Sequence, residues 1–511
     1  MIKFLGHASF YLKFDNVSVV VDPWFSKTGA FLASWAQFPD NSEIDFSWMD
    51  DLTYVCMTHE HEDHFDLDWL AKLNKNTKII IPKYEDRHLY TLLEQHINNE
   101  IIEVSSKSKY KFSDKFSICP VIQSVPIWDD CSFIFETPIG TFLDMNDMKP
   151  SNSDLQWIKD NFKIDYFGIQ YSGANWHPIV YDYSHEEKCT IAQKKIKLKY
   201  ENVLRLFKEF DAQYLIPNFG PPCFLSEDQY HLNFADYSIF PDQVHFYEYA
   251  KANGLEKNTV ILLPDDEFNP DEDLHKLTLK NIKNECFTDK KNYLEKYKTR
   301  RTDIINNYLD SIEVPNYKLI DKVSEYFQPF ITNNRFYRDT ISGNMLLQVK
   351  GKFNEDILIN FKKFKNSVKY YENESYFCKF EIDSKFLNLI LDHKTTWEEL
   401  LLSLRFKARR WPDEYDESLV VFLRFMRRYS EAAIKQYEVY ETNKMLSETF
   451  THIHNGKTYE IQRYCPHALG DLSKGKVVDD HIICPLHGWE FNLKTGECKG
   501  KSKYCIHTEA S

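Results

Sequence analysis

Two short motifs in this chain of 511 residues carry residue types that bind metals. The first lies near the carboxy terminus, where Cys465-Pro466-His467 is followed by Cys484-Pro485-Leu486-His487. Two thiolates and two imidazoles at short spacing can hold a [2Fe–2S] cluster, with both thiolates on one iron and both imidazoles on the other. Zinc is the alternative, because Cys and His at short spacing also bind zinc. The mixed Cys–His composition of each pair favours the cluster, which would carry electrons one at a time.

The residues that follow the second pair refine this prediction. Gly488-Trp489-Glu490-Phe491 resembles the Cys-x-x-His-Gly-Trp-x-Phe loop of Rieske domains in ring-hydroxylating oxygenases. Respiratory Rieske proteins have an additional cysteine in each ligand loop, whereas residues 468–471 and Leu486 include none. Trp489 also stands where the respiratory type has a hydroxyl that hydrogen-bonds the cluster. Fewer such hydrogen bonds stabilise the reduced cluster less, so we predict a low-potential, oxygenase-like cluster.

The second motif is the sequence Thr58-His59-Glu60-His61-Glu62-Asp63-His64. It follows a strand-like run at residues 52–57 and precedes a helical pattern at residues 67–73, so it lies on a strand-to-helix loop. Three histidines and one aspartate on such a loop bring four potential metal ligands close together. The pattern resembles the His-x-His-x-Asp-His motif of the metallo-β-lactamase superfamily.

The flanking sequence agrees with that resemblance. Residues 6–10 open a predicted hairpin whose second strand is Val17–Val21. Residues 141–147 read as a strand that delivers an aspartate where the superfamily has its metal-bridging carboxylate; Asp147 is our choice and Asp144 the alternative. The resemblance implies a two-sheet αββα sandwich with its metal site at one edge of the sheets.

Two departures from the superfamily pattern bear on the reaction. Residues 123–130 contain no histidine, although a hydrolytic member has its third histidine there, and residues 213–217 end at Asn218 where a last histidine is expected. Each usual metal position therefore lacks a ligand, and a dinuclear zinc hydrolase is hard to build. A single non-heme Fe(II), which needs two histidines and one carboxylate, suits the remaining set better.

These motifs define the candidate site residues. The candidate ligands of the single iron, which are also the candidate catalytic residues, are His59, His61, Asp63, His64 and Asp147. The candidate cluster ligands are Cys465, His467, Cys484 and His487. His7, His177 and Asn218 are further candidates, each of which we weigh against a purely structural role.

The combination of the two modules resembles the CMP-N-acetylneuraminate hydroxylase family. Beyond the metal motifs, the likeness rests on Val21-Asp22-Pro23-Trp24, Ser172-Gly173-Ala174, Pro217-Asn218-Phe219-Gly220, Thr396-Trp397-Glu398-Glu399-Leu400 and Arg410-Trp411-Pro412-Asp413. The Rieske module comes first in that family and last in this chain. Electron transfer needs only proximity of cluster and metal, so the order need not change the mechanism, but it leaves the substrate open.

The resemblance implies an O₂-dependent monooxygenase. Electrons would pass from NAD(P)H through a separate donor, such as a ferredoxin, a flavin reductase or a cytochrome b5-like protein, to the cluster and then to the iron. The product would be a hydroxylated polar small molecule, which in that family is a nucleotide-linked amino sugar. A relay between chains would imply a homo-oligomer. The alternatives are a metallohydrolase with a regulatory Rieske domain and an electron carrier with a vestigial amino-terminal domain.

Composition sets limits on the partners and the location. A formal net charge of −14 argues against nucleic acid or an anionic membrane surface as the main partner. No apolar run approaches the roughly 18 residues that would suggest a membrane span. The eleven cysteines are scattered apart from the cluster pairs, and the amino terminus lacks the apolar core of a signal peptide. We therefore expect a cytoplasmic enzyme.

The chain as a whole reads as an α+β multidomain protein. We expect a metallo-β-lactamase-like αββα domain at residues 1–264, a mixed α/β region at 265–436 that completes or covers the site, and a small all-β Rieske domain at 437–511. In the middle region we predict helices at residues 397–406 and 418–436 and a strand at Met345–Lys350. Asn455-Gly456 predicts a tight hairpin. A basic cluster is either a solvated face or a docking site for an anion, and consists of Arg405, Lys407, Arg409 and Arg410.

Overall fold

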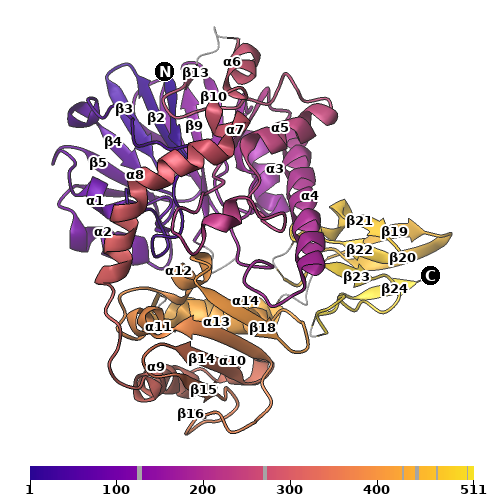
Figure 1. Ribbon diagram of the computed structural model, residues 1–511. Coiled ribbons are helices and arrows are strands. Elements are labelled where there is room, and N and C mark those ends of the chain that lie inside the picture. Colours follow the sequence, from indigo (N-terminus) through magenta and orange to yellow (C-terminus); the bar gives the residue numbers. More distant parts are fainter. Residues whose placement is uncertain are drawn as a thin grey trace. The chain divides into compact units, whose positions relative to one another are not determined.

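The computed structural model describes residues 1–123, 129–268, 273–428, 431–443, 448–467, 470–502 and 504–510 (Figure 1). The chain divides into two compact units. The first unit comprises Met1–Ala174 and Ala192–Asn307, and the second comprises Asn175–Ile191 and Tyr308–Ser511. Within the described residues, no helix combines the length and apolar composition needed to cross a bilayer.

Two β-sheets form the centre of the first unit. The strands of the larger sheet are, in spatial order, β13 (Glu267–Phe268), β1 (Ile2–Gly6), β2 (Ser9–Phe14), β3 (Val17–Val21), β4 (Tyr54–Cys56), β5 (Lys78–Pro82) and β6 (Ile101–Val104). Those of the second sheet are β12 (Tyr214–Asn218), β11 (Tyr166–Gln170), β10 (Gly140–Asp144), β9 (Cys131–Thr137), β8 (Ser117–Ile122) and β7 (Tyr110–Lys111). The neighbours β3 to β6, and likewise β10 to β12, run parallel.

Helices flank the two sheets on their outer faces. The helices of this unit are α1 (Leu67–Leu70), α2 (His88–His96), α3 (Asn152–Asn161), α4 (His185–Phe210, which begins in the second unit), α5 (Gln243–Ala252), α6 (Leu274–Asn281), α7 (Glu285–Thr288) and α8 (Lys290–Ser311, which ends in the second unit), with 3₁₀ turns at Met49–Asp51 and Tyr230–Asn233. Figure 1 shows α1 and α2 beside the larger sheet and α3 to α5 beside the second sheet.

The alternation of apolar side chains along the strands explains this layering. On β9, Phe133 and Phe135 face the larger sheet, whereas Ile134 joins the core beneath α3, α4 and α5. Phe10 of the larger sheet meets Phe142 of the second edge-on, with ring centroids 5.0 Å apart. Each such buried aromatic side chain contributes about 1.5–3 kcal/mol of burial free energy. The predicted αββα sandwich is confirmed.

The connection between β11 and β12 passes through the second unit. It leaves the first unit after Ala174 and returns at Ala192, within α4. In the second unit, the Asp182 amide donates to the carbonyl of Ala408, and the Ala408 amide donates to the carbonyl of Val180. His177 lies on this connection and therefore belongs to the second unit.

A five-stranded sheet organises residues 308–443 of the second unit. Its strands are, in spatial order, β16 (Val368–Tyr370), β15 (Glu355–Ile359), β14 (Met345–Lys350), β17 (Cys378–Asp383) and β18 (Phe406–Arg410). The accompanying helices are α9 (Ile320–Asn333), α10 (Arg335–Thr340), α11 (Ser384–Leu391), α12 (Trp397–Leu402), α13 (Glu417–Arg428) and α14 (Glu431–Asn443). Rings of Phe327, Trp397 and Phe422 pack together in their core.

One predicted helix ends earlier than expected. The helix expected over residues 397–406 ends at Leu402, because Leu404 adopts a left-handed φ of 57° and Phe406 begins β18. Its start is as the sequence suggests, since Thr396 and Glu399 form a capping box. The helix expected over residues 418–436 is found as α13 and α14, on either side of residues 429–430. Residues 429–430 lie outside the described part, as do residues 269–272 near the predicted boundary at 264.

The predicted basic cluster lies on β18 and is engaged with acidic side chains. Lys407 lies 3.1 Å from Glu381, Arg409 lies 3.5 Å from Asp182, and Arg410 lies 2.7 Å from Asp413. These ion pairs neutralise much of the local positive charge.

Two three-stranded sheets form the end of the chain (yellow in Figure 1). One contains β19 (Thr449–His454), β20 (Lys457–Gln462) and β24 (Thr508–Ala510), and the other contains β21 (Lys476–Val478), β22 (His481–Ile483) and β23 (Glu490–Asn492). Asn455 and Gly456 both have positive φ, at 50° and 74°, which confirms the predicted tight hairpin between β19 and β20.

Candidate metal centres

The amino-terminal candidate site forms where parallel strands of both sheets end. Asp22 directly follows β3, and residues 58–64 follow β4; Asp147 follows β10 in the second sheet. Carboxyl ends of parallel strands meet at one sheet edge, where loops converge on a ligand site. Asp66 caps α1 through the Trp69 amide and also accepts from the Phe25 amide, which fixes the end of the motif loop.

The structure brings the predicted ligands together as two groups of three side chains. His59, His61 and Asp147 form what we call group 1, and His7, Asp63 and His64 form group 2. Within each group the potential ligand atoms all lie within 4.8 Å of one another. Each group holds two imidazoles and one carboxylate.

In group 1 the two imidazoles point at each other's ring nitrogens. His59 Nε2 and His61 Nδ1 are 2.8 Å apart. Two ligand nitrogens on one metal lie about 3 Å apart when the metal–nitrogen bonds are about 2.0–2.1 Å long. The separation therefore fits a shared metal ion.

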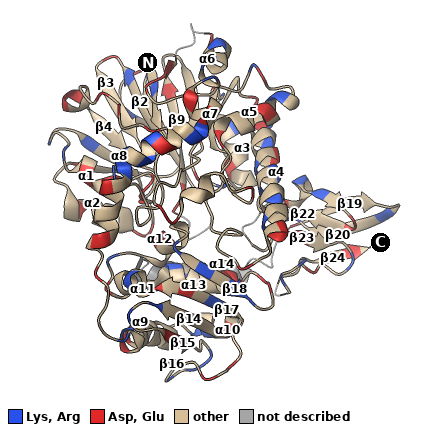
Figure 2. Cartoon of the chain, in the orientation of Figure 1, with Lys and Arg blue, Asp and Glu red and all other residues tan. Residues whose placement is uncertain are grey.

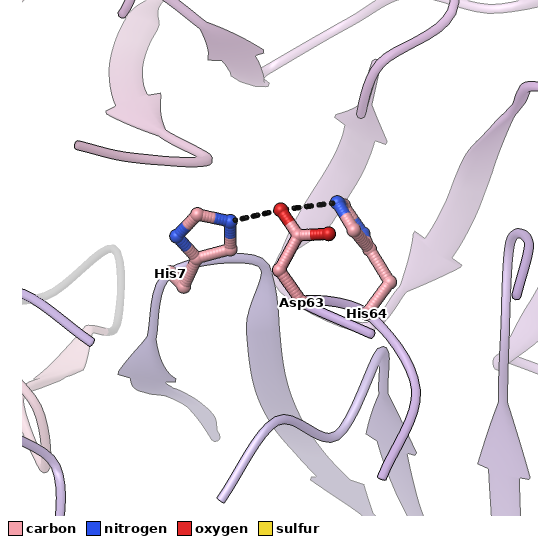
Figure 3. A group of neighbouring side chains, drawn as sticks. All are labelled: His7, Asp63 and His64. Atoms are coloured by element: carbon pink, nitrogen blue, oxygen red, sulfur yellow. Dashed lines mark hydrogen bonds and ion pairs between the residues drawn. The ribbon is translucent and has the colours of Figure 1, made fainter. Parts of the chain in front are cut away.

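In group 2 the Asp63 carboxylate lies between the His7 and His64 rings (Figure 3). Asp63 Oδ2 is 3.0 Å from His7 Nε2 and 3.7 Å from His64 Nε2. His64 also approaches group 1, since its Nε2 is 3.8 Å from Asp147 Oδ2. His64 thus lies between the carboxylates of both groups.

These contacts perturb the protonation of the buried side chains. Burial alone would lower the pKa of His64, but the charges of Asp63 and Asp22 raise it to about 10. Burial favours neutral Asp63, yet the His64 and His7 imidazoles hold the pKa of Asp63 well below its usual range. Burial and the neighbouring imidazoles lower the pKa of His59. The site therefore keeps Asp63 charged, and it keeps the His59 imidazole neutral and able to bind a metal.

Asp22 is a further candidate site residue, which the ligand motif did not include. Its buried carboxylate accepts hydrogen bonds from the amide and hydroxyl of Thr58, both at 2.7 Å, and lies 3.1 Å from His64 Nδ1. A carboxylate on one ring nitrogen orients a histidine whose other nitrogen binds a metal. Within the described residues, the buried Nε2 of His64 has no hydrogen-bond partner, which fits a metal ligand. The sequence signal was the position of Asp22 directly after a buried strand.

The remaining candidates lie outside both groups. Asp144, at the end of β10, is fully buried, and burial together with the charge of Asp22 raises its pKa well above the usual range. Asn218, at the end of β12, is also buried. His177, in the second unit, lies with its Nε2 3.3 Å from the Tyr183 hydroxyl. Residues 124–128, within the stretch lacking the third histidine, are outside the described part.

The raised pKa of His64 predicts how metal affinity depends on pH. Near neutral pH the His64 imidazole of the metal-free protein carries an additional proton. A metal ion that binds His64 must displace this proton, because the metal and the proton compete for the same ring nitrogen. Apparent affinity should therefore rise by about tenfold per pH unit below a pKa of about 10. Anaerobic ferrous titrations at about pH 6, 7 and 8 measure this slope; an affinity independent of pH would show that His64 does not bind the metal.

The carboxy-terminal site contains the four predicted cluster residues. Cys465 and Cys484 are both buried, and burial together with the neighbouring Cys484 thiol raises the pKa of Cys465 well above its usual range. The His467 and His487 rings lie 4.6 Å apart. A Cβ at Gly470 would come within 2.6 Å of the Cys484 sulfur, so only glycine permits this close approach of the two ligand loops. Two adjacent buried thiols facing a histidine pair fit the donor set of a [2Fe–2S] cluster.

Aromatic side chains enclose one of these histidines. Trp489 stacks on His467, with ring centroids 4.2 Å apart and planes inclined by 4°. Tyr415 contacts the same ring edge-on at 5.8 Å, and Glu417 Oε1 lies 3.8 Å from His467 Nε2. The side chains around His467 therefore include Tyr415, which precedes α13, and Glu417, the first residue of α13. The ligand motif alone could not indicate these contacts.

Comparison with known protein families separates the chain into three matched segments. Residues 1–116 match the model of a beta-lactamase superfamily domain, and residues 424–506 match that of the Rieske [2Fe-2S] domain. Residues 319–442 match an Rv3818-like, SCP2-like domain, for which the sequence showed no chemical motif.

Individual relatives match over nearly the whole chain or over a short part of it. A protein of Mycolicibacterium smegmatis named as a putative Rieske 2Fe-2S iron-sulfur protein is 28% identical, over 98% of this chain and 98% of its own. The oxygenase component of 3-ketosteroid-9-alpha-monooxygenase from Rhodococcus rhodochrous is 46% identical over 8% of this chain and 11% of its own. The solved structure of CmlA, a diiron beta-hydroxylase from Streptomyces venezuelae, aligns with 12% identity and a TM-score of 0.36, over 52% of this chain and 53% of its own.

The matched segments agree with the sheets and ligand loops described above. The αββα sandwich carries the beta-lactamase superfamily match, and the two small sheets carry the Rieske match. The chain therefore joins an amino-terminal metallo-β-lactamase fold to a carboxy-terminal Rieske [2Fe–2S] domain.

Proposed function

We propose that this protein is an iron-dependent, Rieske-coupled monooxygenase that hydroxylates a polar small molecule. The observation that carries the proposal is group 1, in which His59, His61 and Asp147 supply two imidazoles and one carboxylate. That donor set is the one used by non-heme Fe(II) oxygenases, which leave positions open for O₂ and substrate. The same chain carries a Rieske domain, whose one-electron chemistry an oxygenase requires.

The protein's own residues would prepare both groups of ligands. Asp22 holds the His64 ring through Nδ1, and Thr58 ties Asp22 to the motif loop. Burial of His59 favours its neutral, ligating form. In the Rieske domain, Cys465 and Cys484 would hold one iron of the cluster, and His467 and His487 the other. When bound, the amino-terminal iron would supply O₂ activation and the cluster would supply electrons.

The proposal includes partners and boundaries. Electrons would come from NAD(P)H through a separate donor, either a ferredoxin, a flavin reductase or a cytochrome b5-like protein, in the cytoplasm. The functional regions would be residues 1–264 for the metal, 265–436 for covering the site and 437–511 for the cluster. Because cluster and metal must come close in space, a relay between two copies of the chain would require a homo-oligomer.

The substrate proposed is a nucleotide-linked amino sugar, from the resemblance to the CMP-N-acetylneuraminate hydroxylase family. The resemblance is carried in part by the short segments Asp22-Pro23-Trp24 and Pro217-Asn218-Phe219. Related amino sugars without the nucleotide form the control set.

The test uses the full-length protein with its cluster and added ferrous iron. The protein is reduced, mixed with a candidate substrate and exposed to isotopically labelled O₂. Mass spectrometry should show a product that contains one labelled oxygen atom and requires both reductant and O₂. A product whose oxygen comes from water, or one that forms without reductant, would contradict the proposal.

One observation favours a second candidate, a metallohydrolase with a regulatory Rieske domain. His7 completes group 2, so the fold offers two neighbouring three-ligand positions despite the missing histidines. Zinc ions held by the two groups would supply a nucleophilic hydroxide. Metal analysis separates the candidates, because the hydrolase would carry two zinc ions beside the cluster, whereas the oxygenase carries iron.

A further inference from the structure

A three-residue hydrogen-bond chain leads from helix α4 to the ligand Asp147 of group 1. The Lys199 amine donates to Gln170 Oε1 at 2.5 Å, and Gln170 Nε2 donates to Asp147 Oδ1 at 2.5 Å. Gln170 is the last residue of β11, so the sheet fixes its backbone beside the metal site. The chain joins three elements of the first unit that are far apart in sequence.

The amide of Gln170 works in only one orientation. Its oxygen accepts and its nitrogen donates, and an amide can turn to exchange them. The Lys199 ammonium has only donors, so it holds the oxygen toward itself and turns the nitrogen toward Asp147. Asp147 Oδ1 is thereby engaged, and Oδ2 is the oxygen that lies 3.8 Å from His64 Nε2.

The Lys199 side chain is more buried than is usual for a lysine on a solvated surface. Figure 2 shows basic residues along α4. Several of them, such as Lys197, are exposed, whereas Lys199 is partly buried. Burial and the nearby charge of Lys149 lower the pKa of the Lys199 amine to about 8. Within the described residues its amine makes no carboxylate ion pair, and a partly buried ammonium without one costs free energy. Stabilisation of the local fold therefore does not explain why a lysine is present at position 199.

We propose that Lys199 and Gln170 are positioning residues that orient Asp147 as a metal ligand. Lys199 acts through Gln170, and Gln170 acts on the carboxylate directly. This inference rests on the proposed iron site, because Asp147 is a ligand only if group 1 binds metal. Partners behind a ligating carboxylate typically change metal affinity by 10–100-fold.

The experiment measures ferrous affinity by anaerobic titration of the full-length protein, with the Rieske cluster intact and the labile iron removed. Lys199→Met should weaken binding by about tenfold or more. Lys199→Arg keeps a donor for Gln170 and should restore most of the affinity. Lys197→Met, at an exposed position on the same helix, is the matched control and should bind iron as the wild type does. Cluster absorbance reports folding in every sample.

A double-mutant cycle separates a relay from an independent structural effect. If Lys199 acts through Gln170, then Lys199→Met should weaken iron binding no further in a Gln170→Ala background. Additive losses would overturn the relay, as would wild-type affinity in Lys199→Met. Gln170→Glu keeps an acceptor for Lys199 but cannot donate a hydrogen bond to Asp147, so this variant should bind iron weakly. It provides a second test should Lys199→Met fail to fold. Wild-type iron affinity in Gln170→Glu would also overturn the proposal. A wild-type protein that binds no ferrous ion would instead refute the proposed function.

Discussion

Replacing His64 with alanine is expected to abolish O₂-dependent product formation while leaving the visible absorbance of the Rieske cluster unchanged. His64 lies 3.1 Å from Asp22, 3.7 Å from Asp63 and 3.8 Å from Asp147, measured between ring nitrogens and carboxylate oxygens. Its removal leaves three carboxylates without the imidazole between them. His64 is a member of group 2 and lies 3.8 Å from Asp147 of group 1, so the variant perturbs both groups.

The expected loss of ferrous affinity is about 100-fold, the upper end for residues that support a ligand. Titration with ferrous ion, together with the labelled-O₂ assay, measures both consequences. His96→Ala removes an exposed histidine at the end of α2 and should behave as the wild type. His59→Ala provides a second variant should His64→Ala unfold, since breaking a buried ion pair costs about 3–5 kcal/mol. Product formation that persists in both variants would rule out this metal centre.

Replacing Cys484 with serine should remove the cluster and stop turnover driven by a reductase. Cys484 is buried beside Cys465, and a serine hydroxyl does not supply the thiolate that the cluster iron requires. Visible absorbance and the paramagnetic resonance signal of the reduced protein should both disappear. Iron at the amino-terminal centre should remain, because its ligands lie in the first unit.

Cys505→Ser is the matched control for the cluster variant. Cys505 is exposed and lies in the same domain, so its replacement should leave the cluster signal intact. If Cys484→Ser kept the cluster signal, the assignment of Cys484 as a ligand would be wrong. If it lost the signal but still turned over with the reductase, the cluster would not be the electron supply.

Local sequence patterns were sufficient for several elements. Asn455 and Gly456 both tolerate left-handed backbone, and the structure uses them in the tight hairpin. The motif at residues 58–64 lies between β4 and α1, as the apolar run and the helical pattern predict. These features depend on neighbours within a few residues, which the sequence shows directly.

The end of α12 and the start of β18 depend on tertiary contacts, which the local sequence pattern does not show. Leu404 continues the helical spacing of the apolar residues Trp397, Leu400 and Leu401, but pairing of β18 with β17 extends the chain from Phe406. The left-handed Leu404 is an unfavourable conformation for a leucine, and the sheet compensates for it. Tertiary pairing therefore outweighed helical propensity at this position.

The candidate metal site required three-dimensional information for its completion. His7 meets Asp63 across two loops of the larger sheet, and Asp22 meets His64 in the same way. Trp489 stacks on His467 from the opposite ligand loop. The ligand types were visible in the sequence, whereas the partners that orient them appear only once the strands are paired.

Metal analysis of the purified full-length protein tests the central claim most directly. We predict about three irons per chain, two in the cluster and one in the amino-terminal centre. The third iron should be lost in His64→Ala and retained in Cys484→Ser. Zinc in the amino-terminal centre, or iron confined to the cluster, would contradict an iron-dependent oxygenase.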